Sequence, residues 1–231
     1  MSRFGHGAKR LFVLLLAALL LYQCWLLAWV GWWKWVNPEQ TSFMSLRLRE
    51  LRLENPQAEL KKTWVSYERI SDHLKRAIIA AEDAKFVDHD GFDWQGIQQA
   101  YEKNQKKGRF VAGGSTISQQ LAKNLFLTPA RTPWRKAQEA VVTLMLEACW
   151  DKERIFEVYL NVIEWGNGVY GAEAAARHYY GVSAAQLSAP QAARLAGMVP
   201  NPRLYDRQRH APGLTRKTAI ILARMPAAEL P

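Results

Sequence analysis

Residues 71–92 read SDHLKRAIIAAEDAKFVDHDGF, and this stretch decides the fold class of the chain. Ser71 is a suitable N-cap residue, and Asp72 suits the first turn of a helix. Apolar residues then follow at the i, i+3, i+4, i+7 spacing of an amphipathic helix: Leu74, Ala77, Ile78 and Ala81. The spacing predicts a helix that ends close to Glu82.

Helix signals continue downstream. Thr132-Pro133 combines an N-cap with an N1 proline and predicts a second helix. We expect its apolar stripe to consist of Trp134, Ala137, Val141, Met145 and Ala148. Ser183-x-x-Gln186 and Ser188-x-x-Gln191 are two successive capping boxes. Strand signals are few and no internal repeat is evident, so the predicted fold class is mainly α.

The N-terminal region contains twenty residues without a charge, Leu11 to Val30. About 20 apolar residues in a helix span a bilayer core. Tryptophans gather at the far end of the run, as in an interfacial aromatic belt: Trp25, Trp29, Trp32, Trp33 and Trp35. A cleaved signal peptide is the alternative, but its apolar region is typically about 7 to 15 residues long. We therefore predict a short tail, 1–10, and a transmembrane anchor, 11–33.

Charges around the anchor predict its orientation. Arg3, Lys9 and Arg10 precede it and only Lys34 follows closely, so the N-terminus is expected in the cytoplasm and the remainder outside. That location excludes substrates such as ATP, NAD and nucleic acid. The formal net charge of +10 suits acidic lipid headgroups or phosphorylated substrates, although general solubility would also explain it. The two cysteines imply no disulfide framework.

Residues 34–62 are predicted to be a connector before a catalytic domain at 63–228. Asn37-Pro38 breaks the helical pattern, and Leu46 to Arg49 alternates like a short strand. A solvated linker is the expected role of this segment.

Glu82 is the first candidate catalytic residue. It stands at the end of the predicted helix, where the macrodipole is negative, and one turn from Ile78 and Ile79. Both features disfavour the ionised carboxylate and predict a raised pKa, which suits a general base. Taken alone, the motif is better explained by Glu82 or Asp83 capping backbone or pairing with Lys85.

Two further motifs carry groups that could hold an anion. Residues 113–124, GGSTISQQLAKN, offer backbone N–H groups, hydroxyls and a positive helix end, although the spacing is not that of a P-loop. An ordinary loop and N-cap is the alternative. Arg135, Lys136 and Glu139 share one helix face, where arginine and lysine could meet phosphate oxygens. As a surface ion pair the same motif would contribute only about 0.3–0.5 kcal/mol.

Taken in order, these segments resemble the peptidoglycan glycosyltransferases. The matching motifs are Glu-Asp-x-x-Phe-x-x-His-x-Gly-Phe, Gly-Gly-Ser-Thr-Ile-Ser-Gln-Gln-Leu-x-Lys-Asn, Arg-Lys-x-x-Glu and Tyr-Leu-Asn, between about Trp64 and Tyr205. The resemblance implies a lysozyme-like, mainly helical domain with a head and a smaller membrane-facing lobe. It further implies an inverting enzyme of the bacterial inner membrane, with its domain in the periplasm, that polymerises lipid II and releases undecaprenyl pyrophosphate.

The resemblance also implies roles for the matched residues. Glu82 would deprotonate the acceptor 4-hydroxyl, and Glu139 would be the second acidic residue. Lys123, Arg135 and Lys136 would surround the donor pyrophosphate. The remaining matched positions are Asp83, Phe86, His89, Ser115, Thr116, Gln120 and Asn124. No cofactor is expected to be required. A divalent cation, Mg or Mn, is the further candidate, although the acidic residues show no fixed spacing of metal ligands.

The predicted partners are lipid II, the growing strand and, as further candidates, cell-wall synthesis or division proteins; nucleic acid is excluded. No Ser-x-x-Lys motif occurs, so no transpeptidase site is expected. A lysozyme-like lytic transglycosylase is the nearest alternative, but it would not need clustered cations. A membrane-anchored scaffold is the alternative without catalysis. The basic segment Tyr101 to Val111 is predicted to be a mobile flap over the donor.

Overall fold

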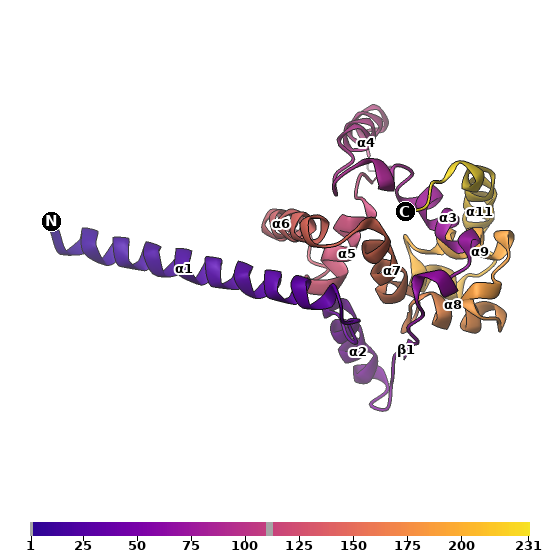
Figure 1. Cartoon of the computed structure of the whole chain (residues 1–231), viewed down its shortest axis with the longest axis horizontal. Helices are drawn as coiled ribbons and strands as arrows, with labels where there is room; N and C mark the ends of the chain where they lie inside the picture. Colours follow the sequence, from indigo (N-terminus) through magenta and orange to yellow (C-terminus); the bar gives the residue numbers. More distant parts are fainter. Residues whose placement is uncertain (1, 110–112) are drawn as a thin grey trace. The chain divides into compact units, whose positions relative to one another are not determined.

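The computed structural model describes residues 2–109 and 113–231 and separates into two compact units, Met1–Asn37 and Pro38–Pro231. Helix α1 (Ser2–Trp33) forms most of the first unit (Figure 1). Its segment Lys9–Trp33 is long and apolar enough to cross a membrane. Aromatic rings contact one another along this segment, with centroids 5.1–6.4 Å apart: Tyr22, Trp25, Trp29 and Trp33.

The second unit is mainly α, as predicted. Its helices are α2 (Ser42–Glu54), α3 (Asp72–Glu82), α4 (Trp94–Lys107), α5 (Ile117–Phe126), α6 (Pro133–Cys149), α7 (Lys152–Val162), α8 (Ala172–Tyr180), α9 (Ala189–Met198), α10 (Pro202–Arg207) and α11 (Pro212–Arg224). A small sheet has the order β1-β3-β2, with β1 (Lys61–Lys62) parallel and β2 (Glu164–Gly166) antiparallel to β3 (Val169–Tyr170).

Two groups of helices build the second unit (Figure 1). In one, α3 packs against α9 and α11; in the other, α5 packs against α6 and α7. Ile78 of α3 and Leu121 of α5 are fully buried in these contacts. The arrangement matters for function because Glu82 ends α3 in the first group, whereas Lys123 lies on α5 in the second.

The predicted helix starts are confirmed. The Ser71 hydroxyl accepts a hydrogen bond from the His73 N–H, and the Thr132 hydroxyl accepts one from the Arg135 N–H. Both predicted capping boxes are present, at Ser183 and at Ser188. Caps were predictable because each one satisfies backbone N–H groups only two or three residues away.

Glycines shape the turn that follows α7. Gly168 and Gly171 have φ angles of +74° and +83°, which side chains with a Cβ rarely adopt. A Cβ on Gly171 would also lie 2.8 Å from the carbonyl oxygen of Asn161. Gly168 thus allows the turn between β2, which begins at Glu164, and β3, and Gly171 allows the change of direction from β3 into α8.

The strand-like interpretation of Leu46 to Arg49 is wrong, because these residues lie inside helix α2. The Thr41 hydroxyl caps the helix by accepting from the Met44 N–H, and Met44 is buried. Four alternating residues fit either structure, and leucine, arginine and glutamate all favour a helix. Helix α2 packs against α5, so this segment is part of the domain and not a solvated linker.

The apolar stripe predicted for α6 is also wrong as the buried face. Trp134 is 68% exposed and Val141 is 38% exposed. The inward face instead carries Gln138, Glu139, Val142, Thr143 and Leu146. The periodicity was helical, but α6 turns its more polar side toward α5 because the charged side chains of the site lie there.

The segment Tyr101 to Val111 begins inside helix α4, which extends to Lys107 and ends with Gly108 in the left-handed conformation. Phe110 and Val111 lie outside the described residues. Its mobility as a flap stays a prediction.

Candidate active site

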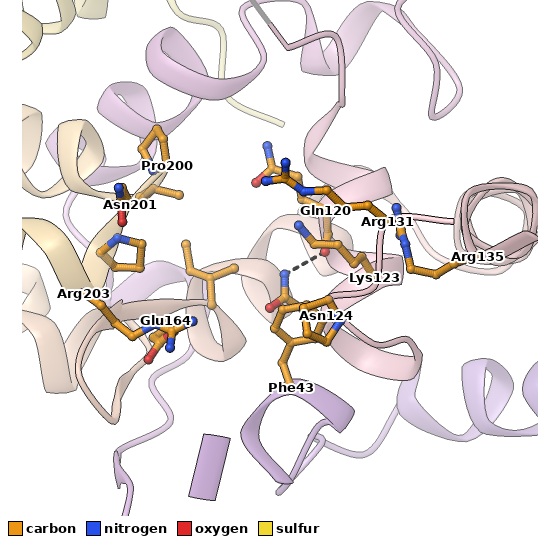
Figure 2. A pocket seen from close by; sticks show the side chains of 14 residues that line it. Phe43, Gln120, Lys123, Asn124, Arg131, Arg135, Glu164, Pro200, Asn201 and Arg203 are labelled. Carbon is orange, nitrogen blue, oxygen red and sulfur yellow. Dashed lines mark hydrogen bonds and ion pairs between the residues drawn. The ribbon is translucent and has the colours of Figure 1, made fainter. Parts of the chain in front are cut away.

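A cleft of about 400 Å³ lies between the two helix groups (Figure 2). Lys123, Arg131 and Arg135 line one wall, and Glu164 and Arg203 line the other. The remaining lining residues come from α2, α5, α10 and three connecting segments: Phe43, Gln120, Asn124, Pro129, Ile163, Val199, Pro200, Asn201 and Pro202. Three cations on one wall make that wall suitable for an anion.

Glu82 lies beside this cleft and is joined to it through one side chain. The Gln120 amide nitrogen donates to the Glu82 carboxylate over 2.9 Å, and Gln120 also lines the cleft. The Tyr159 hydroxyl donates to the Gln120 amide oxygen over 3.0 Å. Because the amide oxygen is engaged in this way, the amide nitrogen is directed at Glu82.

The surroundings of Glu82 shift the pKa of its carboxyl group. Burial raises its pKa above the ordinary value, opposed by the Gln120 hydrogen bond and by the charges of Lys217 and Lys123. Glu82 lines two smaller cavities, of about 180 and 340 Å³. Arg224 lines both of them, and Lys217 lines the first. The predicted raised pKa is therefore confirmed, with burial as its main cause.

Glu139 holds one cation of the cleft wall, Arg135, and its neighbour Lys136. Its carboxylate is 3% exposed and pairs with Arg135 and Lys136 one turn earlier on α6. The Lys123 ammonium lies 5.6 Å from the centre of the Phe43 ring. Burial lowers the pKa of Lys123, opposed mainly by the charge of Glu139. A bound anion would offset that burial cost, so the wall is prepared for a negative group.

Ser115 and Thr116, which follow Gly113 and Gly114, lie close to both Lys136 and Glu82. The Lys136 ammonium contacts the Ser115 hydroxyl at 3.4 Å, and both Ser115 and Thr116 line the larger cavity at Glu82. Thr116 is the N-cap of α5, and its hydroxyl also donates to the Gly91 carbonyl over 2.7 Å. Its hydrogen-bonding capacity is thus largely used within the protein.

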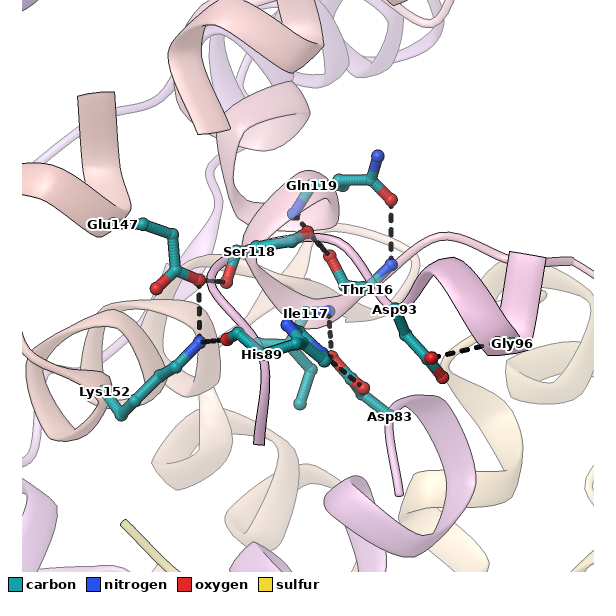
Figure 3. Close-up of polar contacts among 11 residues, drawn as sticks. Asp83, His89, Asp93, Gly96, Thr116, Ile117, Ser118, Gln119, Glu147 and Lys152 are labelled. Atoms are coloured by element: carbon teal, nitrogen blue, oxygen red, sulfur yellow. Dashed lines mark hydrogen bonds and ion pairs between the residues drawn. The ribbon is translucent and has the colours of Figure 1, made fainter. Parts of the chain in front are cut away.

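Asp83 and His89 form a buried network that joins the first two motifs (Figure 3). The Asp83 carboxylate contacts the His89 ring at 3.0 Å and accepts from the Ile117 N–H at 3.0 Å. An acid at the first turn of α5 also interacts favourably with the helix dipole. Asp83 thereby fixes the start of α5 next to the end of α3, which brings Gln120 within reach of Glu82.

A second buried network braces the same region and was not predicted. Glu147 accepts from the Ser118 hydroxyl and, over 2.9 Å, from the Lys152 ammonium (Figure 3). Lys152 also donates to the His89 carbonyl and lies 4.7 Å from the centre of the Phe86 ring. Phe86 is fully buried, so it supports the loop from beneath.

The structure thus divides the predicted residues into three groups. Those lining the cleft are Gln120, Lys123, Asn124 and Arg135. Those at the Glu82 cavities are Glu82, Asp83, Ser115 and Thr116. Neither list contains Lys136, Glu139, Phe86 or His89, which support the neighbouring side chains. Asn124 lines the cleft and also donates to the Gln120 carbonyl over 2.8 Å.

Sequence reasoning missed several residues of the site: Phe43, Arg131, Tyr159, Glu164, Arg203, Lys217 and Arg224. Arg131 could have been found, because it adds a fourth cation to the nearby Lys123, Arg135 and Lys136. Tyr159 lies in the Tyr-Leu-Asn motif and Glu164 follows it closely, whereas Phe43, Arg203, Lys217 and Arg224 come from distant segments and carry no local signal. Within the described ranges 2–109 and 113–231, no group of three or more His, Cys, Asp or Glu could hold a metal ion.

The arrangement can perform proton transfer beside an anionic leaving group. A carboxylate whose pKa is raised by burial is a stronger proton acceptor than an ordinary glutamate. Fixed cations stabilise negative charge that grows as a phosphate departs. Because Gln120 touches Glu82 and lines the cleft, both functions lie within one continuous site.

Comparisons with known proteins agree with this chemistry. A family model described as transglycosylase matches residues 49–226. A biosynthetic peptidoglycan transglycosylase of Dechloromonas aromatica (strain RCB) is 71% identical over 231 residues, which cover both chains completely. Proteins of the same description from Methylobacillus flagellatus and Chromobacterium violaceum are 64% and 61% identical. These matches cover 95% and 94% of the chain and 96% and 95% of the relatives.

Proposed function

The chain belongs to the transglycosylase family, and on this premise we propose that it polymerises lipid II into β-1,4-linked glycan strands. It is an enzyme, a glycosyltransferase of peptidoglycan biosynthesis. The reaction releases undecaprenyl pyrophosphate from the donor. The chain has no Ser-x-x-Lys motif, so it makes strands without cross-linking them.

In the proposed step, Glu82 takes the proton of the acceptor 4-hydroxyl. The hydroxyl oxygen attacks C1 of the donor sugar from the face opposite the pyrophosphate. The new C1–O bond forms, the bond from C1 to the pyrophosphate oxygen breaks, and the configuration at C1 inverts. The raised pKa of the Glu82 carboxylate suits this step, because a base accepts a proton best when its pKa is near the working pH.

The cations of the cleft receive the leaving group. Lys123, Arg131 and Arg135 would face the two phosphates, and Lys136 would extend this set toward Ser115. Glu139 holds Arg135 and Lys136 in place and keeps the wall from carrying an uncompensated charge. Electrostatic stabilisation is strongest when the donors are fixed before the charge develops.

One observation carries the proposal: a single side chain, Gln120, is hydrogen-bonded to the candidate base and lines the cationic cleft. A lytic transglycosylase would also need an acidic residue, but it would act on a glycosidic oxygen and release no pyrophosphate. Three cations on one wall would then have no anionic partner.

The proposed location is the bacterial inner membrane, with the N-terminus in the cytoplasm and the domain in the periplasm. One apolar helix near the N-terminus supports anchoring, and Lys9 and Arg10 before it support this orientation. The exposed apolar side of α6, with Trp134 and Val141, supports a lobe that faces the membrane. Anchoring keeps enzyme and lipid-linked substrate in one plane.

We further propose that no cofactor is required for the chemistry. Mg and Mn are the divalent cations whose effect on the rate should be tested. Lipid II and the growing strand are the proposed substrates, and cell-wall synthesis or division proteins are the proposed protein partners. No role for nucleic acid is proposed.

Polymerisation of lipid II by the full chain in detergent or vesicles tests the function. The wild type should make glycan strands, and Glu82→Gln should lower kcat by about 100-fold or more, the usual scale for a positioned base. Finished murein should remain uncut. Cleavage of murein without polymerisation would establish the lytic reaction instead.

Lys123→Ala and Arg135→Ala serve as a matched pair for the leaving-group site. Both should impair donor use, whereas sedimentation with vesicles should stay unchanged. Equal losses in both measurements would contradict the assignment of the cations to the pyrophosphate.

A further inference from the structure

Glu164 lines the cleft wall opposite Lys123 and Arg135 and belongs to a four-residue charge cluster that extends behind this wall. Arg47 and Arg203 approach its carboxylate at 3.5 and 3.6 Å. The same two arginines also contact Glu50, at 2.5 and 3.5 Å. Two arginines and two glutamates therefore alternate, and they join α2, β2 and α10.

The two glutamates of the cluster differ in their exposure and in their hydrogen bonding. The Glu50 side chain is 54% exposed and makes the short contact with Arg47. The Glu164 side chain is 14% exposed, and its two arginine contacts are longer than hydrogen bonds. Within the described part of the chain, Glu164 Oε1 is a buried oxygen with no hydrogen-bond partner. Oε1 lies 3.5 Å from Arg47 Nε, which is likewise buried without a hydrogen-bond partner, whereas Oε2 lies 3.6 Å from Arg203, a residue that lines the cleft.

The side of the Glu164 carboxylate next to Arg203 is therefore the one that can accept hydrogen bonds from a ligand in the cleft. Together with Asn201 and Arg203 it lines the wall that faces the three cations (Figure 2). Burial raises the pKa of the Glu164 carboxylate despite both arginines. Arg203 balances the charge of Glu164 at this wall, and a carboxylate oxygen is best satisfied by a group that donates hydrogen bonds, which an ionised phosphate does not. The volume of about 400 Å³ is that of a site for a whole ligand and exceeds what a diphosphate alone would fill.

We propose that Glu164 and Arg203 form a sugar subsite, in which Glu164 accepts hydrogen bonds from the hydroxyl and acetamido groups of the donor sugar next to the pyrophosphate. The inference rests on the proposed function, because it takes the cationic wall to hold the pyrophosphate. Arg47 is a positioning residue that holds Glu164 from α2. The subsite orients the ring so that C1 faces the acceptor.

The subsite includes residues that lie before the segment matched by the family model. Phe43 and Arg47 lie on α2 before residue 49, where the match begins. Arg47 contacts Glu164 and also the Asn167 side chain in the β2–β3 turn. The helix that follows Pro38 thus contributes to this wall of the cleft and its selectivity for the sugar.

Binding of two lipid probes to the full-length protein tests the subsite. One probe is undecaprenyl pyrophosphate, and the other is the same lipid carrying the disaccharide without its peptide. Glu164→Gln should weaken binding of the disaccharide probe by about 10-fold, the scale of a hydrogen bond to a charged group. Binding of undecaprenyl pyrophosphate should not change, whereas Lys123→Ala should weaken binding of both.

Glu50→Gln is the matched control, because Glu50 contacts the same two arginines and does not line the cleft. It should bind both probes as the wild type does. Three results would overturn the subsite: equal weakening of both probes by Glu164→Gln, no weakening of either, or the same loss in Glu50→Gln. A wild type that fails to polymerise lipid II would instead refute the proposed function, so the two failures are distinguishable.

Discussion

The C-terminal end of α3 and the first turns of α6 each bring one carboxylate to the candidate active site, in opposite surroundings. Glu82 meets a neutral amide, Gln120, and borders open cavities. Glu139 is buried and is bound to two cations, Arg135 and Lys136. The difference teaches that two acids of one site can have separate tasks. In the proposed function, Glu82 would accept a proton, whereas Glu139 would hold charge in place.

Glu139→Gln should produce the largest change in stability. Removing one partner of a buried ion pair leaves a charge uncompensated, which costs about 3–5 kcal/mol when both partners are buried. The Lys136 side chain is 48% exposed and can turn to water, so we expect a smaller loss, about 2 kcal/mol. Denaturant unfolding of the solubilised protein measures this, with the exposed Glu102→Gln as the control. Unchanged stability with a loss of kcat would make Glu139 a second proton acceptor.

The pH dependence of activity tests whether Glu82 acts as the proton acceptor. A base must be ionised, so kcat/KM should fall on the acid side of the Glu82 pKa, which burial places above the ordinary 4.5. Lys217 favours the ionised form, so Lys217→Gln should move the acid limb to still higher pH. Rates of both proteins across pH measure the shift. A loss that is equal at every pH would show that Lys217 binds substrate instead.

The smallest expected effect is a gain in stability. Because the native state holds the Glu82 proton more tightly than the unfolded state, wild-type stability should fall as pH rises above about 4.5 toward the raised pKa. Glu82→Gln removes that cost, and its Tm at neutral pH should rise on the order of 2 °C. Thermal unfolding at pH 4 and pH 7 tests this. The gain should vanish at pH 4, and a lower Tm at pH 7 would mean that the carboxylate stabilises the fold.

Local patterns predicted the features that depend on neighbouring residues. Caps at Ser71 and Thr132, the position of Glu82 at the end of α3, and its raised pKa are confirmed. The caps and the helix end depend on groups within one helical turn, whereas the pKa shift of Glu82 has its main cause in burial by distant segments. The predictions were wrong for α2, which was expected to contain a short strand, and for the buried face of α6. At both places the local pattern allowed two structures, and packing against α5 decided between them.

The sequence by itself determined the mainly helical class, the apolar N-terminal segment, and the order of motifs that marks the family. Only the tertiary structure decided that Gln120 would join Glu82 to the cations, and that Glu164 and Arg203 would close the opposite wall. The physical reason is the distance along the sequence over which each interaction acts. Helix periodicity and capping operate over three or four residues, whereas a cleft is formed by side chains that meet only when distant helices pack together.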